Sequence, residues 1–379
     1  MRILMTLTYY YPHWTGLTAY AQRLAEGLAG RGHTVTVLTS QYDPQLPRAE
    51  MHEGVRIVRL PSLFRLSRGQ VMPRFIGALR ELVLEHDVVQ VHTPMLETWL
   101  VGAIAHGAGR KMLMTHHGDL VMPTGWWNQF VQRTVGYWLD RGADAADHIT
   151  THSQDYADNS AYLRPYLDKL TAIYPPVVMP DPDLEAVAAW RADLGLEGRP
   201  LVGFAGRFVE EKGFDYLLQA IPTVTAQLPG VIFAYAGDHK VVYESFFDHC
   251  RQLVDANAAC VRFMGLITDK QRLANFYAMC DLFVLPSRTD CFPSVQIESL
   301  YCGTPLVCTD IPGAREVVRA TGMGRLVAPR DPQALAEGLL AVLNHPEDYR
   351  VSPERARQVF SLEETLSRYE ALLGELAAS

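Results

Sequence analysis

The sequence predicts an α/β fold made of two doubly wound parallel sheets, and three observations lead to this expectation. Short apolar runs alternate with longer amphipathic stretches along the whole chain, which is typical of parallel strands joined by helices. The length of 379 residues suffices for two or three domains. Four prolines between Tyr174 and Asp183 interrupt the alternation, because proline continues neither a helix nor a central strand. We therefore expect one domain over residues 1–175 and a second over residues 176–360, with this proline-rich segment as the linker at their boundary.

The individual elements follow from the hydrophobic pattern in chain order. The expected strands are short apolar runs: Arg2–Thr8, Thr34–Thr39, Val55–Leu60, Val88–His92, Lys111–Thr115 and His148–Thr151, then Leu201–Ala205, Val231–Ala236, Val261–Met264, Leu282–Leu285 and Pro305–Cys308. The expected helices are the amphipathic stretches between them: Thr18–Gly30, Pro73–Glu85, Asn128–Arg141, Phe214–Leu228, Lys270–Cys280 and Ser294–Cys302. The last stretch, Ser361–Ala377, also predicts a helix.

Composition and charge exclude several classes of protein. The net charge of −8 argues against nucleic acid as the main partner. No apolar run approaches the roughly 20 residues that a membrane-spanning helix needs, and the opening residues resemble a buried strand more than a signal peptide. The six cysteines form no C-x-x-C pair, which favours free thiols over a zinc site. We expect a cytoplasmic protein, attached at most peripherally to the inner face of a membrane.

One loop of the second domain carries two cations where a ligand is expected to bind. Ligands of doubly wound sheets lie outside the carboxyl ends of the strands. The loop over residues 203–213 follows a predicted strand and contains Arg207 and Lys212, whose guanidinium fork and ammonium group suit phosphate oxygens. The alternative is that both cations pair with Glu210 and Glu211 in solvent.

A second loop of this domain, over residues 286–298, carries two carboxylates. Asp290 lies in a turn after a predicted strand, and Glu298 lies about one turn into the following helix. Carboxylates accept hydrogen bonds from sugar hydroxyls, and the amides at a helix start favour an anion. The sequence Asp181-Pro182-Asp183 has the spacing of a metal-binding D-x-D motif, but it lies in the proline-rich linker with no strand before it, so we assign it no metal.

The first domain contributes two further loops. Gly16 precedes the first predicted helix and allows close approach of a ligand to the backbone, although an ordinary turn glycine is the alternative. His116, His117 and Asp119 follow the strand over Lys111–Thr115. Adjacent histidines are poor spacing for a metal, so one of them fits better as a hydrogen-bonding or acid–base group, with a packed loop histidine as the alternative.

Taken together, these loops resemble glycosyltransferase family 4, a retaining family with the GT-B fold of two facing Rossmann-like domains. The segment PHWTGLTAYAQRLAEGLAGRGHTVTVLT resembles the family's glycine loop and second strand, and GRFVEEKGFDYLLQAI resembles its G-R-x-x-x-x-K-G motif. The block from FMGLITDKQRL to CTDIPGAREVV resembles its nucleotide-binding region with the E-x7-E element. The resemblance spans nearly the whole chain and implies that the helix over residues 361–379 returns to the first domain.

The resemblance implies a role for each residue of these motifs. Its donor-binding residues would be Gly16, Arg207, Lys212, Leu266, Asp290, Phe292, Ser294, Val295 and Glu298. In that assignment Arg207 and Lys212 hold the diphosphate of a nucleotide sugar, with the amide of Gly16 facing the distal phosphate. Glu298 accepts from the ribose, and Leu266 lies beside the base.

The donor sugar and the acceptor would be held by the remaining motif residues. Asp290 and the amides of Phe292, Ser294 and Val295 would hold the donor sugar. His117 corresponds to the histidine of the family's H-x-D loop and would face the sugar and the reacting centre, with Asp119 nearby. Together with Arg207 and Lys212, the resemblance makes His117 and Asp290 the catalytic residues. Asp119 and Trp14 are expected on the acceptor side.

The implied reaction transfers a sugar from a nucleotide-diphosphate sugar to a hydroxyl acceptor with retention of configuration. Preorganised cations and amides would stabilise the leaving phosphate, so we expect neither a divalent metal nor another cofactor. Two departures from the family pattern put the donor sugar in question: Thr15 stands at the first family glycine and Asp290 at the first glutamate of E-x7-E. The alternatives are a non-catalytic nucleotide-sugar-binding protein and an epimerase or phosphorylase on the same fold.

The acceptor side of the first domain suggests a lipid-linked or membrane-proximal acceptor. Basic and apolar residues without an acid are mixed over residues 55–80, and Trp126, Trp127 and Phe130 form an aromatic cluster. Such mixtures suit an anionic membrane surface. The alternative is that Phe75, Ile76 and Leu79 are core positions of a helix with solvated arginines.

Overall fold

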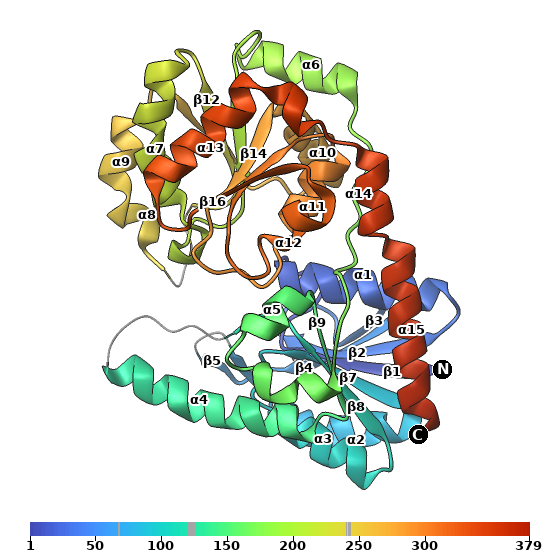
Figure 1. The fold of residues 1–379 in the computed structure, drawn as a ribbon. Coiled ribbons are helices and arrows are strands. Elements are labelled where there is room, and N and C mark those ends of the chain that lie inside the picture. Colours follow the sequence, from blue (N-terminus) through green and yellow to red (C-terminus); the bar gives the residue numbers. More distant parts are fainter. Residues whose placement is uncertain (67–68, 120–125, 240, 242–243) are drawn as a thin grey trace. The chain divides into compact units, whose positions relative to one another are not determined.

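The computed structural model describes residues 1–66, 69–119, 126–239, 241 and 244–379, and for Leu66 and residues 126–132 it describes the backbone alone. The chain forms two compact units (Figure 1), one of Met1–Pro176 with Leu362–Ser379 and one of Val177–Ser361. The predicted α/β fold class is confirmed. The boundary expected after residue 175 lies one residue from the division that the structure shows.

The first unit is built on a sheet whose central strands are buried and parallel. In spatial order the sheet contains β10 (Leu170–Ala172), β9 (His148–Thr151), β8 (Lys111–His116), β7 (Val88–Thr93), β1 (Arg2–Thr6), β2 (Thr34–Gln41), β4 (Val55–Pro61) and β3 (Ala49–His52). The edge strand β3 runs antiparallel to β4, while β1 pairs in parallel with β2 on one side and with β7 on the other. The strand order therefore reverses between β1 and β7. In a separate two-stranded sheet, β5 (Phe64–Leu66) pairs antiparallel with β6 (Gly69–Val71).

Helices lie between most of the parallel strands of the first unit, and one more follows the second unit in the chain. They are α1 (Gly16–Gly30), α2 (Phe75–Glu85), α3 (Thr98–Gly107), α4 (Trp126–Ala145), α5 (Gln154–Asn159), the 3₁₀ turn η1 (Arg164–Lys169) and α15 (Leu362–Ala378). The C-terminal helix α15 belongs to this unit: Leu366, Tyr369 and Leu373 are buried in one core with residues of α1, β1, β2 and β4. Gly27 on α1 permits this packing, because a β-carbon there would lie 2.6 Å from the side chain of Leu366.

The second unit repeats the same topology with six parallel strands. In spatial order they are β13 (Val261–Gly265), β12 (Ile232–Ala236), β11 (Leu201–Ala205), β14 (Leu282–Leu285), β15 (Leu306–Thr309) and β16 (Gly324–Val327). Every residue of β11, β12, β14 and β15 is buried, which explains their unbroken apolar sequences. Here the strand order reverses between β11 and β14, the position at which doubly wound sheets bind ligands.

The helices of the second unit include several that the hydrophobic pattern did not predict. They are α6 (Leu184–Asp193), η2 (Glu210–Lys212), α7 (Phe214–Gln227), α8 (Phe246–His249), α9 (Arg251–Ala256), α10 (Lys270–Met279), α11 (Ser294–Tyr301), α12 (Glu316–Thr321), α13 (Pro332–Asn344), η3 (Pro346–Tyr349) and α14 (Pro353–Val359). The six cysteines lie in this unit as free thiols, and all except Cys260 are buried. In the described part of the chain, no helix is both long and apolar enough to span a membrane.

Candidate functional site

The cationic loop after β11 passes directly against the end of β14. Gly213 ends η2 in the left-handed region with φ 66°, and a β-carbon there would lie 2.0 Å from the carbonyl oxygen of Pro286. Only glycine fits this approach. The close contact brings the two loops that the sequence singled out to one place at the strand-order reversal.

Lys212 and Asp290 form an ion pair across these two loops. The Nζ atom of Lys212 donates to Oδ2 of Asp290 at 2.5 Å, and the two side chains are 18% and 11% exposed. The hydroxyl of Ser287 donates to the same carboxylate oxygen at 3.3 Å. Burial alone lowers the pKa of Lys212, but the charges of Asp290 and Glu211 outweigh it and raise the pKa above its ordinary value. Lys212 is therefore a fixed ammonium charge.

Arg207 lies nearer to solvent than Lys212. Its Nη2 atom donates to Oε1 of Glu211 at 3.2 Å, and the two side chains are 44% and 40% exposed. Of the two cations, Arg207 thus makes the solvent pairing considered from the sequence, whereas Lys212 pairs with Asp290. An exposed pair of this kind contributes at most about 1 kcal/mol, so a phosphate can replace Glu211 at little cost.

Arg288 holds the two loops together, and this role was not predicted from the sequence. Its guanidinium donates to both carboxylate oxygens of Asp215 on α7 at 2.8 and 2.7 Å, and to the carbonyl of Glu210 at 2.6 Å. It also lies 4.2 Å from the ring centre of Tyr216. The backbone N–H of Arg288 donates to the carbonyl of Glu211 at 2.7 Å. Lys212 is thus held in place by contacts on both sides of its loop.

The turn that contains Asp290 leads into the start of α11. Asp290 forms a backbone bridge with Gly313, where a β-carbon would lie 2.0 Å from the carbonyl of Cys291. Pro293 precedes α11 without a side-chain cap, and Ser294 and Val295 are its first two residues. The first amides of a helix have no partner within that helix, so these amides are suited to bind an anion. Phe292 is buried here, with its ring centre 6.2 Å from that of Phe360.

Glu298 and Leu266 occupy contrasting surroundings. Glu298, on α11, is 5% exposed and accepts a hydrogen bond at 3.0 Å from the hydroxyl of the buried Tyr277 on α10. Leu266 is 60% exposed directly after β13, where Gly265 has φ 75°. Glu298 is therefore an oriented acceptor, and Leu266 is an apolar side chain accessible to a flat ring.

The acidic residues of the D-x-D sequence, to which no metal was assigned, have other roles in the structure. Asp183 caps the start of α6 by accepting from the amides of Glu185 and Ala186, and Asp181 pairs with Arg357 at 2.5 Å. Among the described residues, one group of three side chains has the spacing of a metal site, and it consists of the exposed His345, Glu347 and Asp348. Exposed acidic groups of this kind commonly hold no ion.

In the first unit, Gly16 and Thr15 begin helix α1. Gly16 is the first helical residue, and a β-carbon there would meet nothing within 4 Å. Thr15 is the N-cap: its hydroxyl accepts from the amide of Thr18 at 3.2 Å, while its own amide donates to the Thr18 hydroxyl at 2.8 Å. The threonine in place of a family glycine therefore stabilises the start of the helix. Trp14, just before it, is 45% exposed.

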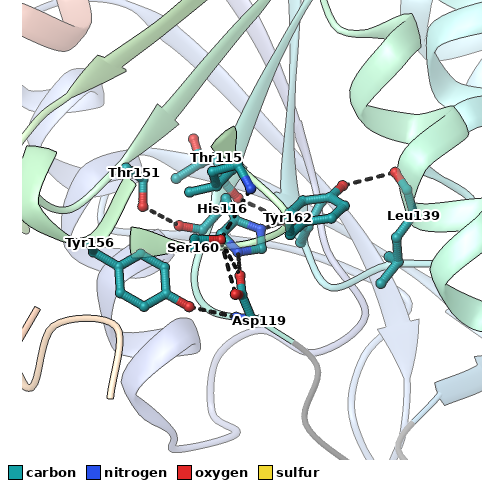
Figure 2. A network of polar contacts seen from close by, with 10 residues as sticks. Thr115, His116, Asp119, Leu139, Thr151, Tyr156, Ser160 and Tyr162 are labelled. Carbon is teal, nitrogen blue, oxygen red and sulfur yellow. Dashed lines mark hydrogen bonds and ion pairs between the residues drawn. The ribbon is translucent and has the colours of Figure 1, made fainter. Parts of the chain in front are cut away.

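Asp119 is held by a network at the end of β8 (Figure 2). It pairs with Nε2 of His116 at 3.0 Å and accepts from the hydroxyl of Ser160 at 2.8 and 2.9 Å, while its amide donates to the Tyr156 hydroxyl at 2.8 Å. The ring of Tyr162 stacks on His116 at 4.9 Å. Burial raises the pKa of Asp119, but the contacts with His116 and Ser160 outweigh it and lower the pKa below its ordinary value. Asp119 is therefore an ionised anchor for its loop.

His117 has different partners from His116. Its Nε2 atom lies 2.9 Å from Nδ1 of His92 at the end of β7. The ring centres of Tyr20 and His152 lie 4.7 and 5.0 Å from that of His117. Burial and the neighbouring histidines lower the pKa of His117 well below its usual value, so the ring is neutral at physiological pH. His92 and His152 were not predicted as site residues, because the fold alone brings them to His117.

The basic segment over residues 55–80 is only partly a surface. Arg59 is 2% exposed, and its guanidinium donates to Glu50 and to the carbonyls of Pro47 and Tyr11. Phe75 and Leu79 are buried in the core. Arg59, Phe75 and Leu79 thus correct the expectation of a continuous membrane-facing patch, because burial satisfies them within the protein.

Other residues of the expected membrane-facing segment are exposed, and some lie outside the described residues. Leu63 is 71% exposed, Phe64 is 56% exposed and Ile76 is 42% exposed. Arg68 and the side chains of Trp126, Trp127 and Phe130 lie outside the described residues.

Comparison with known proteins indicates the family of the chain. Residues 15–175 match the family described as glycosyl transferase 4-like domain, and residues 199–345 match glycosyl transferases group 1. An uncharacterized glycosyltransferase of Methanocaldococcus jannaschii is 26% identical over 361 residues, covering 91% of this chain and 89% of that protein. A GDP-mannose-dependent alpha-(1-6)-phosphatidylinositol monomannoside mannosyltransferase of Mycolicibacterium smegmatis is 27% identical over 356 residues, covering 88% and 87%.

Solved structures show the same fold. Sucrose-phosphate synthase from Thermosynechococcus elongatus superposes with a TM-score of 0.80 at 24% identity, covering all of both chains. An Anabaena protein solved in complex with UDP-glucose superposes with a TM-score of 0.76 at 20% identity, covering 99% of this chain and all of that one. The fold and the matched domains define a transferase of glycosyl groups. The chain belongs to the GT-B glycosyltransferases of the family 4 type. The epimerase, phosphorylase and non-catalytic alternatives are not favoured.

Proposed function

We propose that this enzyme transfers a sugar from a nucleotide-diphosphate sugar to a hydroxyl acceptor, with retention of configuration and without a divalent metal. The observation that carries the proposal is the Lys212–Asp290 pair at the strand-order reversal between β11 and β14. A fixed ammonium, a neighbouring guanidinium and a helix start are gathered at the position where such sheets bind phosphates. Relatives and structural neighbours whose names include GDP-mannose and UDP-glucose support a nucleotide-sugar donor.

The donor's diphosphate would be held by Lys212 and Arg207. Departure of the nucleotide places negative charge on the phosphate oxygen that leaves the anomeric carbon, and charges already fixed at that position stabilise it without reorganisation. Lys212 is such a charge, because Asp290 and the Arg288 contacts hold its loop. Arg207 would exchange Glu211 for a phosphate oxygen. These cations supply the stabilisation for which other transferases use a metal.

The rest of the donor would contact residues of known orientation. Glu298, oriented by Tyr277, would accept from the ribose hydroxyls, and the exposed Leu266 would lie against the base. Asp290 would accept from a hydroxyl of the sugar, and the amides of Ser294 and Val295 would donate to it. Asp290 has a second role as counter-ion of Lys212, which gives a physical reason for an acidic residue at this position whatever the sugar.

In the first unit, the residues proposed to contact the donor are His117 and Gly16. The neutral imidazole of His117 would form a hydrogen bond with a sugar oxygen, and the amide of Gly16 would face the distal phosphate. The acceptor would attack the face that the nucleotide leaves, with a leaving phosphate oxygen accepting the acceptor's proton. This route gives retention without a protein nucleophile. Asp119, with its oxygens bound to His116 and Ser160, would position the His117 loop.

The acceptor is proposed to be lipid-linked or close to a membrane surface. The exposed Leu63 and Phe64 lie beside Arg65 at the start of β5, and this apolar and basic group suits an anionic interface. Flotation with vesicles of anionic lipid at low salt should recover the protein, and Leu63→Ser with Phe64→Ser should reduce the recovery. Absence of binding at low salt would overturn the membrane contact and leave the transfer reaction untouched.

A panel of nucleotide sugars tests the donor directly. A donor at 100 times its dissociation constant stabilises the folded enzyme by about 2.7 kcal/mol, so the melting temperature should rise for the true donor. The shift should persist in EDTA and disappear in Lys212→Ala. A shift that requires a divalent ion would refute the metal-free reaction, and the absence of any shift across UDP-, GDP- and ADP-sugars would refute the donor class.

A further inference from the structure

Four aromatic side chains of the first unit pack against one another at the carboxyl ends of its strands. His92 is the next-to-last residue of β7, His117 follows β8, His152 follows β9, and Tyr20 comes from α1. The ring centres of His92 and His117 lie 5.2 Å apart, and those of Tyr20 and His152 lie 4.9 Å apart. His92 is 1% exposed and His117 is half-buried. His117 is thus the more exposed of these two histidines.

The two rings that share a hydrogen bond are both neutral. Burial lowers the pKa of His92 to about 3, and burial with neighbouring histidines lowers that of His117 well below its usual value. A neutral imidazole carries one ring hydrogen, so its other nitrogen can only accept. The 2.9 Å contact between Nδ1 of His92 and Nε2 of His117 then has two forms, which differ in the ring that donates.

The other nitrogen of His92 distinguishes the two forms. If His117 donates, the hydrogen of His92 must lie on Nε2, which is buried and has no hydrogen-bond partner among the described residues. A buried N–H group without a partner is rarer in proteins than an under-used acceptor. If His92 donates, its hydrogen lies on Nδ1, in the hydrogen bond, and Nε2 of His92 is only an unused lone pair.

We infer that His92 donates its Nδ1–H to Nε2 of His117, and that His92 thereby fixes the hydrogen of His117 on Nδ1. His117 then presents an N–H group, so it acts in transfer as a hydrogen-bond donor to an oxygen of the substrate and not as a base. His92 is a positioning residue, because it acts through His117. The statement about transfer rests on the proposed function, whereas the position of the hydrogen does not.

The position of the hydrogen can be read by nitrogen NMR on the whole enzyme. With ¹⁵N-labelled histidine, two-bond correlations report which nitrogen of each ring carries hydrogen, and the signals of His117 are those missing from His117→Ala. We expect His117 protonated on Nδ1 alone near pH 7. Protonation on Nε2, or on both nitrogens, would overturn the inference, and this measurement needs no variant of His92.

Two variants of His92 test the positioning role. The amide nitrogen of Asn reaches close to the position of Nδ1, so His92→Asn retains a donor to His117, whereas His92→Leu retains volume alone. We expect His92→Leu to lower kcat about 10- to 100-fold by releasing His117, and His92→Asn to recover most of that loss. Equal losses in both variants would refute the role of His92 as a donor.

Controls separate this inference from the proposed function. His86 is a buried histidine of the same unit that contacts Thr36 and the carbonyl of Leu82, away from this cluster. His86→Asn should leave the Nδ1 hydrogen of His117 in place. Full transfer activity in His117→Ala would refute the catalytic role of His117, while the NMR result would still decide the position of the hydrogen.

Discussion

The parallel strands of the two sheets follow the same order, but the side chains at the point where that order reverses are charged in one unit and neutral in the other. In the second unit the ends of β11 and β14 carry fixed charges, with Lys212 paired to Asp290 and Arg288 paired to Asp215. In the first unit the ends of β7 and β8 carry histidines whose pKa values are lowered by burial. The same topology therefore supports a cluster of fixed charges in one unit and a cluster of neutral rings in the other.

The difference shows how burial acts on different side chains. Burial opposes every charge, but Lys212 has a carboxylate at 2.5 Å that outweighs the loss of water. For His92 and His152 burial is the dominant effect, and it lowers both pKa values to about 3. Fixed charges suit a ligand such as a nucleotide diphosphate, and neutral rings suit a ligand such as a sugar hydroxyl.

Removing the cation of the second unit should have the largest effect. Lys212→Ala should lower kcat/KM about 10²- to 10³-fold, because one preorganised group at the developing charge is lost. The control is Arg251→Ala, which removes a cation from the exposed Arg251–Asp248 pair of the same unit. Initial rates with saturating acceptor measure both. Transfer at the wild-type rate in Lys212→Ala would refute the role of this charge in the second unit.

Loosening the loops around Lys212 should affect stability. Arg288→Ala should destabilise the second unit by about 1.5–3 kcal/mol, since it leaves Asp215 and a carbonyl without their charged partner. Arg288→Lys should recover only part, because lysine lacks the two-pronged geometry. Hydrogen exchange of α7 and β14 amides measures the change. Unchanged protection in Arg288→Ala would show that Lys212 is held by its own ion pair alone.

Acid should unfold the first unit through its histidines. A folded pKa near 3 for His152 lies below the unfolded value of about 6.5, so the unfolded state binds the proton first and stability falls as the pH drops from 6.5 towards 3. Each such histidine contributes a slope of about 1.4 kcal/mol per pH unit. His152→Asn should reduce the slope by that amount.

Urea unfolding followed by tryptophan fluorescence measures this slope, because five of the six tryptophans lie in the first unit. His345→Asn is the control, since that side chain is exposed in the other unit. An unchanged slope in His152→Asn would mean that this histidine is already charged when folded, and the contrast between the units would fail there.

The smallest effects should come from the start of α1. Thr15→Ala should destabilise the first unit by about 1 kcal/mol through loss of the cap. Gly16→Ala should not destabilise it, because the added methyl group meets nothing within 4 Å. Weaker donor binding by Gly16→Ala would then report contact with the ligand. Urea unfolding and donor titration measure the two effects, and equal destabilisation by both variants would contradict the assignment of Thr15 as the cap.

The sequence predicted several strands well, most clearly the buried runs that contain no polar side chain. The runs over His148–Thr151, Leu201–Ala205 and Leu282–Leu285 match the observed strands at both ends. The missed elements have weaker patterns: β3 alternates intermediate and exposed residues, and α12 has only six. Pro332 is the first residue of α13, a position that proline favours, but no helix was predicted there.

The residues of the candidate site were predictable where a single loop after a strand contains both charged residues and glycines or a turn. Arg207, Lys212 and Asp290 were named from loops that follow strands, and the structure brings the last two together. Arg288 and His92 were not named, because their roles depend on Asp215 and His117, which lie far from them in the sequence. Pairings of this kind become visible only when the sheet sets neighbouring strands side by side.

The C-terminal helix α15 has a consequence for biosynthesis. Tyr369 hydrogen-bonds to Tyr20 at 2.5 Å, and Glu370 pairs with Arg31 at 2.8 Å and with His33 at 2.6 Å. These partners of the first unit leave the ribosome early, whereas α15 is translated only after the whole second unit. The unit that begins first is thus finished last, because α15 completes the core that it shares with α1, β1, β2 and β4.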